Sequence, residues 1–454
     1  MNPREDTIIA LATPQGTSAL AVIRLSGSDS LRLTSKLFRG KDLTQQKTHT
    51  VHLGTLHTPA HPIDEVLVTV FREGRSFTKE NSVEITCHGS PLIIKEIIQA
   101  FLQEGARLAQ PGEFTQRAFL NGRFDLAQAE AVADLIHAET DNARQAALNQ
   151  MRGGFSKEIQ RLRDELIHFA SLIELELDFG EEDVEFAQRD DLRKLIQQLL
   201  SYLQRLIDSF EQGRVIKNGI PTVIAGKPNA GKSTLLNALL NEERAIVSDI
   251  PGTTRDVIED EMTLGGIHFR FMDTAGLRDT TDAIEAMGIE RTHAYLRKAS
   301  LILYLFDLSN TTPAAMEAED AEIRKLNIPY LKIGNKADKA LPANLHWAQA
   351  HEALVISASH PADIELLQKK ILERFALPDV KPGDVVVTNL RHVQQLQRTS
   401  ESLTRVLHGL DRGTTGDLLA MDIRQALYHL GEITGTITTD DLLDNIFSKF
   451  CIGK

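Results

Sequence analysis

The sequence predicts an α/β domain inserted into an all-α helical domain, with an α+β domain in front of both. Apolar runs alternate with helical segments between about residues 219 and 376, as a doubly wound sheet requires. Apolar residues at helical spacing lie on both sides of this part, and strand-like runs dominate the start of the chain. We therefore expect four segments, the second and fourth forming one helical domain: 1–120, 121–218, 219–376 and 377–454.

The composition indicates a soluble globular protein. The chain has 454 residues, and about 150 residues per domain suggests three domains. A net charge of −13 argues against a general polyanion binder, so RNA would need a local basic patch or a partner. Two cysteines exclude a disulfide framework and a Cys-rich zinc site. We find no secretory leader and no run of ~20 apolar residues, and therefore expect no membrane span and a cytoplasmic protein.

The first 120 residues indicate a mixed α/β structure. Leu20–Leu25, Val66–Phe71 and Ser82–Thr86 have strand character, and Ile93–Leu102 reads as a helix. This part lacks a phosphate loop of its own.

The flanking segments are helical. Helical spacing or composition marks these segments: 127–148, 159–177, 192–210, 390–410 and 418–430. The turn between the second and third carries seven carboxylates from Asp178 to Asp191. We interpret it as a solvated acidic loop, with a metal site as the alternative.

Gly226–Ser233 fits the phosphate-loop pattern G-x-x-x-x-G-K-[ST]. It follows a predicted strand, Thr222–Ala225, and precedes a predicted helix, Thr234–Leu240. Glycines let the backbone wrap a phosphate, and the helix N-terminus supplies positive potential. Lys232 would reach the β- and γ-phosphates and the hydroxyl of Ser233 would ligate Mg²⁺.

A second motif selects the base. In Asn335–Asp338 the last carboxylate can accept two N–H bonds from the Watson–Crick edge of guanine, where adenine presents the wrong groups. Ser357–Ser359, after an apolar run, suits a guanine-contacting loop. Between these motifs, Asp273–Gly276 suits an outer-shell bond to Mg²⁺ and a γ-phosphate contact, and Gly252–Asp256 offers a Thr to Mg²⁺. The sequence predicts a GTP site.

The machinery for hydrolysis is less evident. Leu277 stands where small GTPases place a water-orienting Gln. The chain is therefore either a slow switch or supplies another residue, with four candidates in the following stretch: Arg278, Asp279, Asp282 and Glu285. Asn229 lies where its amide oxygen could hold a monovalent cation such as K⁺, completed by carbonyls of 248–252, although local backbone bonding is an equal alternative.

The chain resembles the MnmE (TrmE) family of tRNA modification GTPases over essentially its whole length. The GTPase motifs above and three further segments carry this resemblance. The three segments are Pro111–Asn121, Asp125–Ala131 and Ile446–Lys454. The GTPase motifs alone would fit several ribosome-assembly GTPases, whereas these three are specific to the family.

The resemblance implies a P-loop GTPase domain inserted into the helical domain, and an N-terminal folate-binding domain that mediates homodimerisation. It implies work with the FAD-dependent partner MnmG, in a heterotetramer or larger complex. Together they would install aminomethyl or carboxymethylaminomethyl groups at carbon 5 of the tRNA wobble uridine. The one-carbon unit would come from methylenetetrahydrofolate, bound as the 5,10-methylene or the 5-formyl form. K⁺ would drive pairing of the GTPase domains and so trigger hydrolysis.

The resemblance also assigns residues. The catalytic residue falls on Glu285. The Mg²⁺ ligands fall on Ser233 and Thr254. K⁺ contacts fall on Asn229, Ser248, Ile250 and Thr253. Folate contacts fall on Arg24, Glu84, Arg123 and Lys454. The predicted GTP contacts are Asn229, Ala230, Gly231, Lys232, Ser233, Thr234, Ser248, Asp249, Ile250, Pro251, Gly252, Thr253, Thr254, Asp273, Thr274, Ala275, Gly276, Asn335, Lys336, Asp338, Ser357, Ala358 and Ser359.

A few positions depart from the family pattern. Ser359 stands where a basic residue often occurs, and His360-Pro361 replaces a Gly-containing turn. Cys451 is fourth from the end, as in a prenylation signal, but Gly453 and the terminal Lys fit that signal poorly. A buried cysteine is a second interpretation, and the resemblance favours a reactive thiol near the folate pocket.

Two rival functions remain at this point. A GTP switch in ribosome assembly would need a basic RNA-binding domain, whereas the flanks are helical and the chain is acidic. A folate-binding scaffold with a vestigial GTPase would not need the intact Lys232, Ser233, Thr254 and Asp273.

Overall fold

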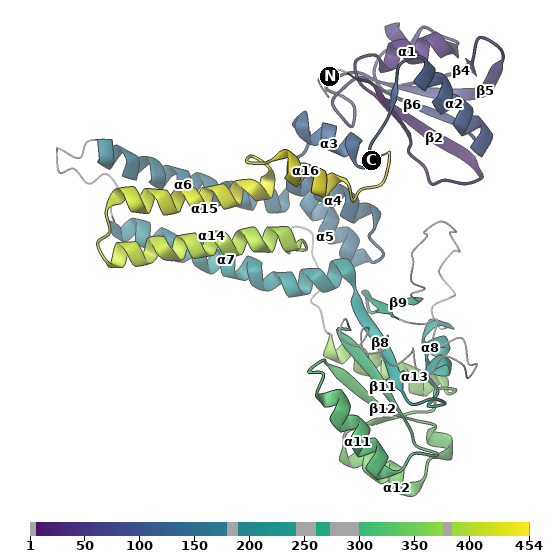
Figure 1. The fold of residues 1–454 in the computed structure, drawn as a ribbon, viewed down its shortest axis with the longest axis vertical. Helices are drawn as coiled ribbons and strands as arrows, with labels where there is room; N and C mark the ends of the chain where they lie inside the picture. The colour runs from purple at the N-terminus through teal and green to yellow at the C-terminus, as the bar shows by residue number, and fades with distance from the viewer. Residues whose placement is uncertain (1–5, 179–188, 242–259, 273–298, 376–383, 454) are drawn as a thin grey trace. The chain divides into compact units, whose positions relative to one another are not determined.

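The computed structural model describes residues 6–178, 189–241, 260–272, 299–375 and 384–453 (Figure 1). The chain divides into two compact units. The first comprises Met1–His137, Ala147–Ile207 and Leu390–Lys454, and the second comprises Ala138–Ala146 and Asp208–Asn389. Each unit is therefore discontinuous in sequence, as expected for a domain inserted into another.

The first unit contains a seven-stranded sheet in the order β3-β4-β5-β6-β2-β1-β7. Its pairs are antiparallel except for β1 with β7, which is parallel. Helices α1 and α2 pack on one face through a shared apolar core with the strands. The strands are β1 (Ile8–Leu11), β2 (Ser18–Ser26), β3 (Phe38–Arg39), β4 (Thr50–His57), β5 (Pro62–Phe71), β6 (Ser82–Gly89) and β7 (Arg107–Leu108), and the helices are α1 (Ser30–Leu37), η1 (Leu43–Gln45) and α2 (Pro91–Gln103).

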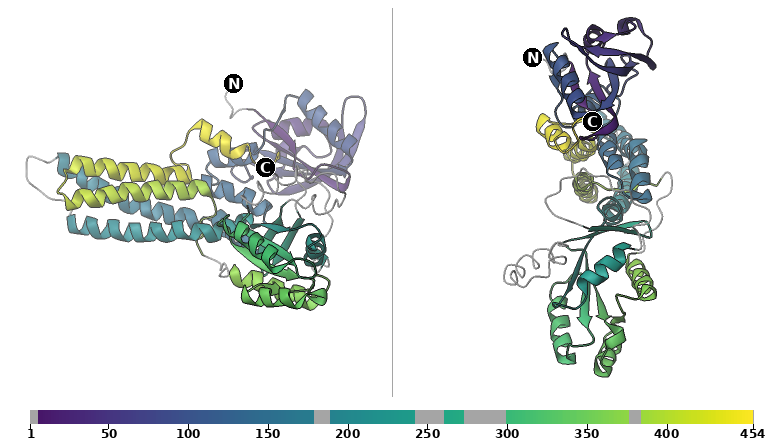
Figure 2. Two further views of the ribbon diagram at one scale, coloured as in Figure 1. Left: turned by 60° about the horizontal axis from the view of Figure 1, so that its bottom comes forward. Right: turned by 90° about the vertical axis from the view of Figure 1, so that its right-hand side faces the viewer.

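Helices make up the rest of this unit. Four long ones, α6, α7, α14 and α15, run side by side in Figure 1 and in the left view of Figure 2. Asp125 and Gln128 form a capping box at the start of α4. The helices are α3 (Glu113–Leu120), α4 (Leu126–Ile136), α5 (Asp141–Met151), α6 (Gly154–Asp178), α7 (Arg189–Asn218), α14 (Leu390–Asp411), α15 (Gly416–Thr434) and α16 (Asp440–Phe447), of which α5 and the end of α7 reach into the second unit.

The second unit contains a six-stranded sheet in the order β13-β12-β11-β8-β10-β9. All its pairs are parallel except β9 with β10. One apolar cluster unites this sheet with α8 and α13, and another unites it with α11 and α12, so helices cover both faces. The elements are β8 (Ile220–Gly226), α8 (Lys232–Asn241), β9 (Asp260–Leu264), β10 (Ile267–Phe271), β11 (Leu301–Asp307), α11 (Pro313–Arg324), β12 (Tyr330–Asn335), η2 (Ala337–Lys339), α12 (Pro342–Ala350), β13 (Leu354–Val355) and α13 (Pro361–Arg374).

The predicted fold class is confirmed, whereas the segment boundaries at residues 120, 218 and 376 stay a prediction. One predicted element differs. The helical segment 127–148 is two helices, because α4 ends where the His137 ring contacts the carbonyl of Ala133 and Thr140 caps α5 by accepting from the N–H of Ala143. The centre of the acidic turn, 179–188, lies outside the described residues. Among the helices that are described, none is long and apolar enough to span a membrane.

Candidate nucleotide site and N-terminal ligand site

The phosphate loop connects β8 to α8, in the predicted strand–loop–helix context. Gly226 and Gly231 have φ of +147° and +97°, and Asn229 has φ of +63°. Left-handed backbone is open to glycine and tolerated by Asn, which explains these residue types in a tight turn. The loop therefore has the backbone needed to turn its N–H groups toward one ligand.

Lys232 is folded over this loop. Its Nζ donates to the carbonyls of Gly226 and Lys227 at 2.8 and 2.9 Å. Burial lowers the pKa of this ammonium group. A lysine tethered by backbone carbonyls and partly stripped of water is suited to exchange those contacts for phosphate oxygens.

Asn335 joins the two loops that were predicted to contact the nucleotide. It is buried, its Nδ2 donates to the carbonyl of Ala230 at 2.7 Å, and its Oδ1 accepts from the N–H of Ala358 at 3.0 Å. A Cβ on Gly231 would lie 2.3 Å from this Nδ2, so only glycine fits there. Asn335 thus positions the phosphate loop against Ser357–Ser359, the second segment predicted to contact guanine.

Asp338 is exposed beside that loop and accepts from the Ser357 hydroxyl at 3.2 Å. The N–H of Ser357 is held by Asp363 at 2.7 Å. The exposed Asp338 carboxylate is available to the edge of a guanine, and Asp363 holds the neighbouring Ser357–Ser359 loop in place.

The sequence reading missed Asp307, at the end of β11. Lys336 has left-handed backbone (φ +63°) and its Nζ donates to Asp307 at 2.7 Å. Burial alone raises the pKa of Asp307, but bonds from Lys336 and Ser309 outweigh it and hold that pKa below its usual value. Asp307 therefore anchors the turn at Lys336. Its sequence signal was a carboxylate at the end of a central parallel strand.

Several predicted site residues lie outside the described ranges. They are the whole of Ser248–Thr254, the whole of Asp273–Gly276 with Leu277, the catalytic candidate Glu285, and Lys454. Ser233 and Thr234 are described, in the first turn of α8.

A second group of predicted residues meets on the N-terminal sheet. Arg24 on β2 and Glu84 on β6 are opposite each other in the strand register, and the guanidinium donates twice to Glu84 Oε1, at 2.9 and 2.7 Å. Arg24 and Arg123 stack over the ring of Phe77, 5.5 and 5.4 Å from its centroid. The structure therefore brings two of the four predicted folate contacts, Arg24 and Arg123, over one aromatic ring, and a third, Glu84, pairs with Arg24.

Phe77 was not predicted as a site residue. It lies between β5 and β6, and Arg123 also donates to the carbonyl of its neighbour Ser76. An aromatic residue among polar ones in a loop was the available signal.

The C-terminal tail reaches the same place. Arg24 Nη1 donates to the carbonyl of Gly453 at 3.3 Å. A Cβ on Gly453 would lie 2.4 Å from the carbonyl of Leu11, so the tail passes close to β1. Cys451 is exposed, whereas Cys87 is buried, and burial raises the pKa of the Cys87 thiol to about 11. Of the two thiols, only Cys451 is open to a ligand or to oxidation.

Comparison with known proteins identifies the family of this chain. A family model described as the GTP-binding protein TrmE N-terminus matches residues 7–123, and one described as the MnmE helical domain matches residues 126–451. A protein of Cytophaga hutchinsonii named tRNA modification GTPase MnmE is 58% identical over 99% of this chain and 98% of its own length. Proteins of the same name from Christiangramia forsetii and Bacteroides fragilis are 51% and 47% identical over 99% of this chain and 99% and 100% of theirs.

A solved structure, the G domain of the T. maritima FeoB iron transporter, is 24% identical over 35% of this chain and 99% of that chain. Its TM-score is 0.26, too low to support a conclusion. The two family models and the near full-length identities are decisive: the chain belongs to the MnmE family of tRNA modification GTPases.

Proposed function

We propose that this GTPase couples GTP hydrolysis to modification of carbon 5 of the tRNA wobble uridine. In this proposal it acts with the FAD-dependent partner MnmG and installs aminomethyl or carboxymethylaminomethyl groups. The observation that carries the proposal is that one chain of the family combines an intact phosphate and guanine site with the Arg24–Phe77–Arg123 cluster. Nucleotide energy and a one-carbon ligand are two of the inputs that such a reaction requires, and the amine nitrogen of the installed group must come from a separate amine donor.

The residues of the α/β unit fit GTP with Mg²⁺. Lys232 would exchange the carbonyls of Gly226 and Lys227 for phosphate oxygens. Asp338 would accept from guanine, and the Ser233 hydroxyl, with Thr254, would ligate Mg²⁺. Mg²⁺ would neutralise charge that develops on the phosphates.

The N-terminal cluster fits a folate. A flat pteridine ring offers N–H donors along one edge that a carboxylate such as Glu84 can accept, and the glutamate tail of a folate is anionic. Arg24 and Arg123 supply cations, and Phe77 supplies an apolar face between them. When bound, the tetrahydrofolate derivative would supply the one-carbon unit. Gly453 at Arg24 supports a role for the tail, with Lys454 and Cys451, at the rim of this site.

Potassium and Glu285 complete the proposal. Asn229 is exposed on the phosphate loop, where its amide oxygen can reach a cation beside the phosphates. K⁺ held there with Ser248, Ile250 and Thr253 would take the place of an arginine finger. Glu285 would orient the attacking water, a role that Leu277 cannot perform.

Homodimerisation is proposed for the N-terminal domain. Its sheet exposes Val51, Leu53 and Leu67, at 56, 64 and 43%, and Leu53 lies opposite Leu67 in the β4–β5 register. Exposed apolar side chains that gather on one face of a sheet are a feature of interaction surfaces. A second copy of the chain is the occupant that we propose.

Mass spectrometry of tRNA nucleosides tests the function. Cells that lack this chain should lose the modified wobble uridine and regain it with the wild-type chain. Lys232→Ala should fail to restore it because hydrolysis is lost, and Arg24→Ala should fail while GTP hydrolysis persists. Identical nucleosides with and without the chain would show that the proposed function is wrong.

A further inference from the structure

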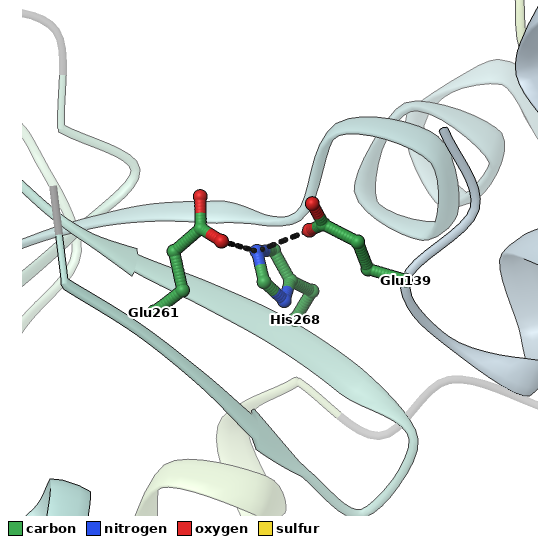
Figure 3. Close-up of side chains that lie close together, drawn as sticks. All are labelled: Glu139, Glu261 and His268. Atoms are coloured by element: carbon green, nitrogen blue, oxygen red, sulfur yellow. Dashed lines mark ion pairs between the residues drawn. The ribbon is translucent and has the colours of Figure 1, made fainter. Parts of the chain in front are cut away.

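A group of potential metal ligands lies in the α/β unit, formed by residues without a role in the nucleotide site. It consists of Glu139 from the segment between α4 and α5, Glu261 from β9 and His268 from β10 (Figure 3). Their ligating atoms all lie within 4.8 Å of one another. No other group of three such residues meets this condition within the described parts of the chain.

The imidazole of His268 is the centre of the group. The residue is 8% exposed, and neither ring nitrogen makes a well-formed hydrogen bond with a described residue. Nε2 lies 2.9 Å from an oxygen of Glu139 and 3.8 Å from an oxygen of Glu261. Figure 3 shows the two carboxylates on opposite sides of this nitrogen. A buried nitrogen that faces two anionic oxygens is either protonated or coordinated.

The surrounding backbone keeps the ring in this place. Gly219, which directly follows α7, has φ of +69°, and a Cβ there would lie 2.6 Å from the carbonyl of His268 and 2.9 Å from its ring. Thr140, next to Glu139, caps α5. Farther along α5, Ala143 and Ala146 pack with Ile216 and Val386. The three ligands are thus carried by elements that are packed together independently of any ion.

The donor set matches a borderline metal ion. Zn²⁺ binds imidazole nitrogen and carboxylate oxygen at about 2.0–2.2 Å, often through three protein ligands and water. Ligand atoms at that distance from one ion are roughly 3–4 Å apart, close to the separations of 2.9 and 3.8 Å at Nε2. We propose that Glu139, Glu261 and His268 bind one divalent transition-metal ion of the Zn²⁺ class. The ion fastens the segment before α5 to the β9–β10 hairpin.

A proton competes with the metal for the same nitrogen. Burial by itself lowers the pKa of His268, and Glu139 and Glu261 more than offset it, raising that pKa to about 9. Glu139 and Glu261 are the charged groups that act on the ring, and Arg270 lies opposite Glu261 in the strand register. A metal ion binds only the unprotonated nitrogen, so the apparent affinity should rise with pH.

The test uses the full-length chain, freed of metals by a chelator and kept in excess Mg²⁺ and GDP so that the nucleotide site is filled. Zn²⁺ is then titrated in by calorimetry at neutral pH, in two buffers of different ionisation enthalpy. We expect one tight equivalent per chain with release of about one proton. His268→Gln should weaken that equivalent at least tenfold, and Glu261→Gln should weaken it without removing a buried ring.

The matched control is His351→Gln. His351 also pairs with a carboxylate, Glu317 at 2.8 Å, but among the described residues it pairs with that one alone, and its ring stacks on Trp347. This variant should bind Zn²⁺ as the wild type does. Circular dichroism establishes that each variant is folded. If folded His268→Gln and Glu261→Gln bind as tightly as the wild type, or the wild type has no tight equivalent, binding is adventitious only and the site does not exist. Neither result bears on GTP hydrolysis or tRNA modification.

Discussion

Asn335 and Asp338 belong to one sequence motif, yet they have different roles in the structure. The Asn335 amide is used up in bonds to Ala230 and Ala358. Asp338 is exposed and contacts only a serine hydroxyl among the interactions described for it. The motif could be predicted to select guanine, but not that its first residue fastens two loops, because that depends on tertiary contacts.

This difference can be measured with two variants. Asn335→Ala should weaken GDP and GTP alike and lower the melting temperature, because it leaves a buried carbonyl and N–H without partners. Asp338→Asn should weaken guanine nucleotides by roughly 1–3 kcal/mol, since a charge-assisted acceptor is lost, with little change in melting temperature. Calorimetric titration and thermal unfolding of both variants check this. A larger melting shift in Asp338→Asn than in Asn335→Ala would contradict it.

At the scale of secondary-structure elements, a buried cluster of charged residues joins helices α4 and α14. Glu130 on α4 accepts two bonds from Arg391, both at 2.9 Å, and lies 2.6 Å from Nε2 of His392. Arg391 also donates to the carbonyls of Glu432 and Ile433 at the end of α15. The cluster therefore fixes the point where the chain re-enters the helical domain.

Glu130→Gln should destabilise the chain by about 3–5 kcal/mol because buried cations lose their counter-charge. Burial alone raises the pKa of Glu130, but His392 and Arg391 outweigh it and lower that pKa to about 2. A depressed pKa contributes stability above the ordinary value near 4.5 that is lost as the pH falls toward 2. Urea unfolding should thus show the gap between wild type and variant narrowing below about pH 4.5. A constant gap would argue against an ionised Glu130.

The same cluster shows which features of the fold could not be predicted from the sequence. The apolar spacing of 159–177, 192–210, 390–410 and 418–430 predicted the four long helices, because helix periodicity is local. Which helices meet, and that Glu130 finds Arg391 261 residues away, depends on packing that no local pattern records. Phe77 and the group around His268 escaped prediction for this reason, whereas the phosphate loop was found because all its parts are contiguous.

For the molecule as a whole, the exposed apolar face on β4 and β5 predicts self-association. Leu53→Asp should dissociate the dimer, since burying an unpaired charge against a second copy is unfavourable. Leu366→Asp is the control, because Leu366 is likewise an exposed leucine, at 43% against 64% for Leu53, but lies on α13. Sedimentation velocity at matched concentrations distinguishes the two. A dimer that survives Leu53→Asp would place the interface elsewhere.

Potassium should accelerate hydrolysis more than sodium does, because Na⁺ is too small to fill a carbonyl cage while also touching the phosphates. Asn229→Ala should flatten this difference and leave Mg²⁺-dependent nucleotide binding largely intact. Steady-state rates in the two chloride salts at equal ionic strength provide the measurement. Equal wild-type rates would remove the case for a cation at Asn229.

Substitution of Glu285 provides the most specific test of the proposal that hydrolysis requires two paired copies of the molecule. Glu285 stands twelve residues beyond Asp273 in sequence. In our proposal, K⁺ pairs two GTPase domains, closure excludes water, and the Glu285 carboxylate orients the attacking water. Glu285→Ala should keep GTP affinity and K⁺-induced pairing but lose ~10²–10⁴-fold in single-turnover rate, as expected for a positioned acid–base group. Asp282→Ala is the matched control and should retain the rate. If the Glu285 variant hydrolyses GTP as fast as the wild type under K⁺, the water is oriented by another group, and Asp279 or Asp282 becomes the residue to examine.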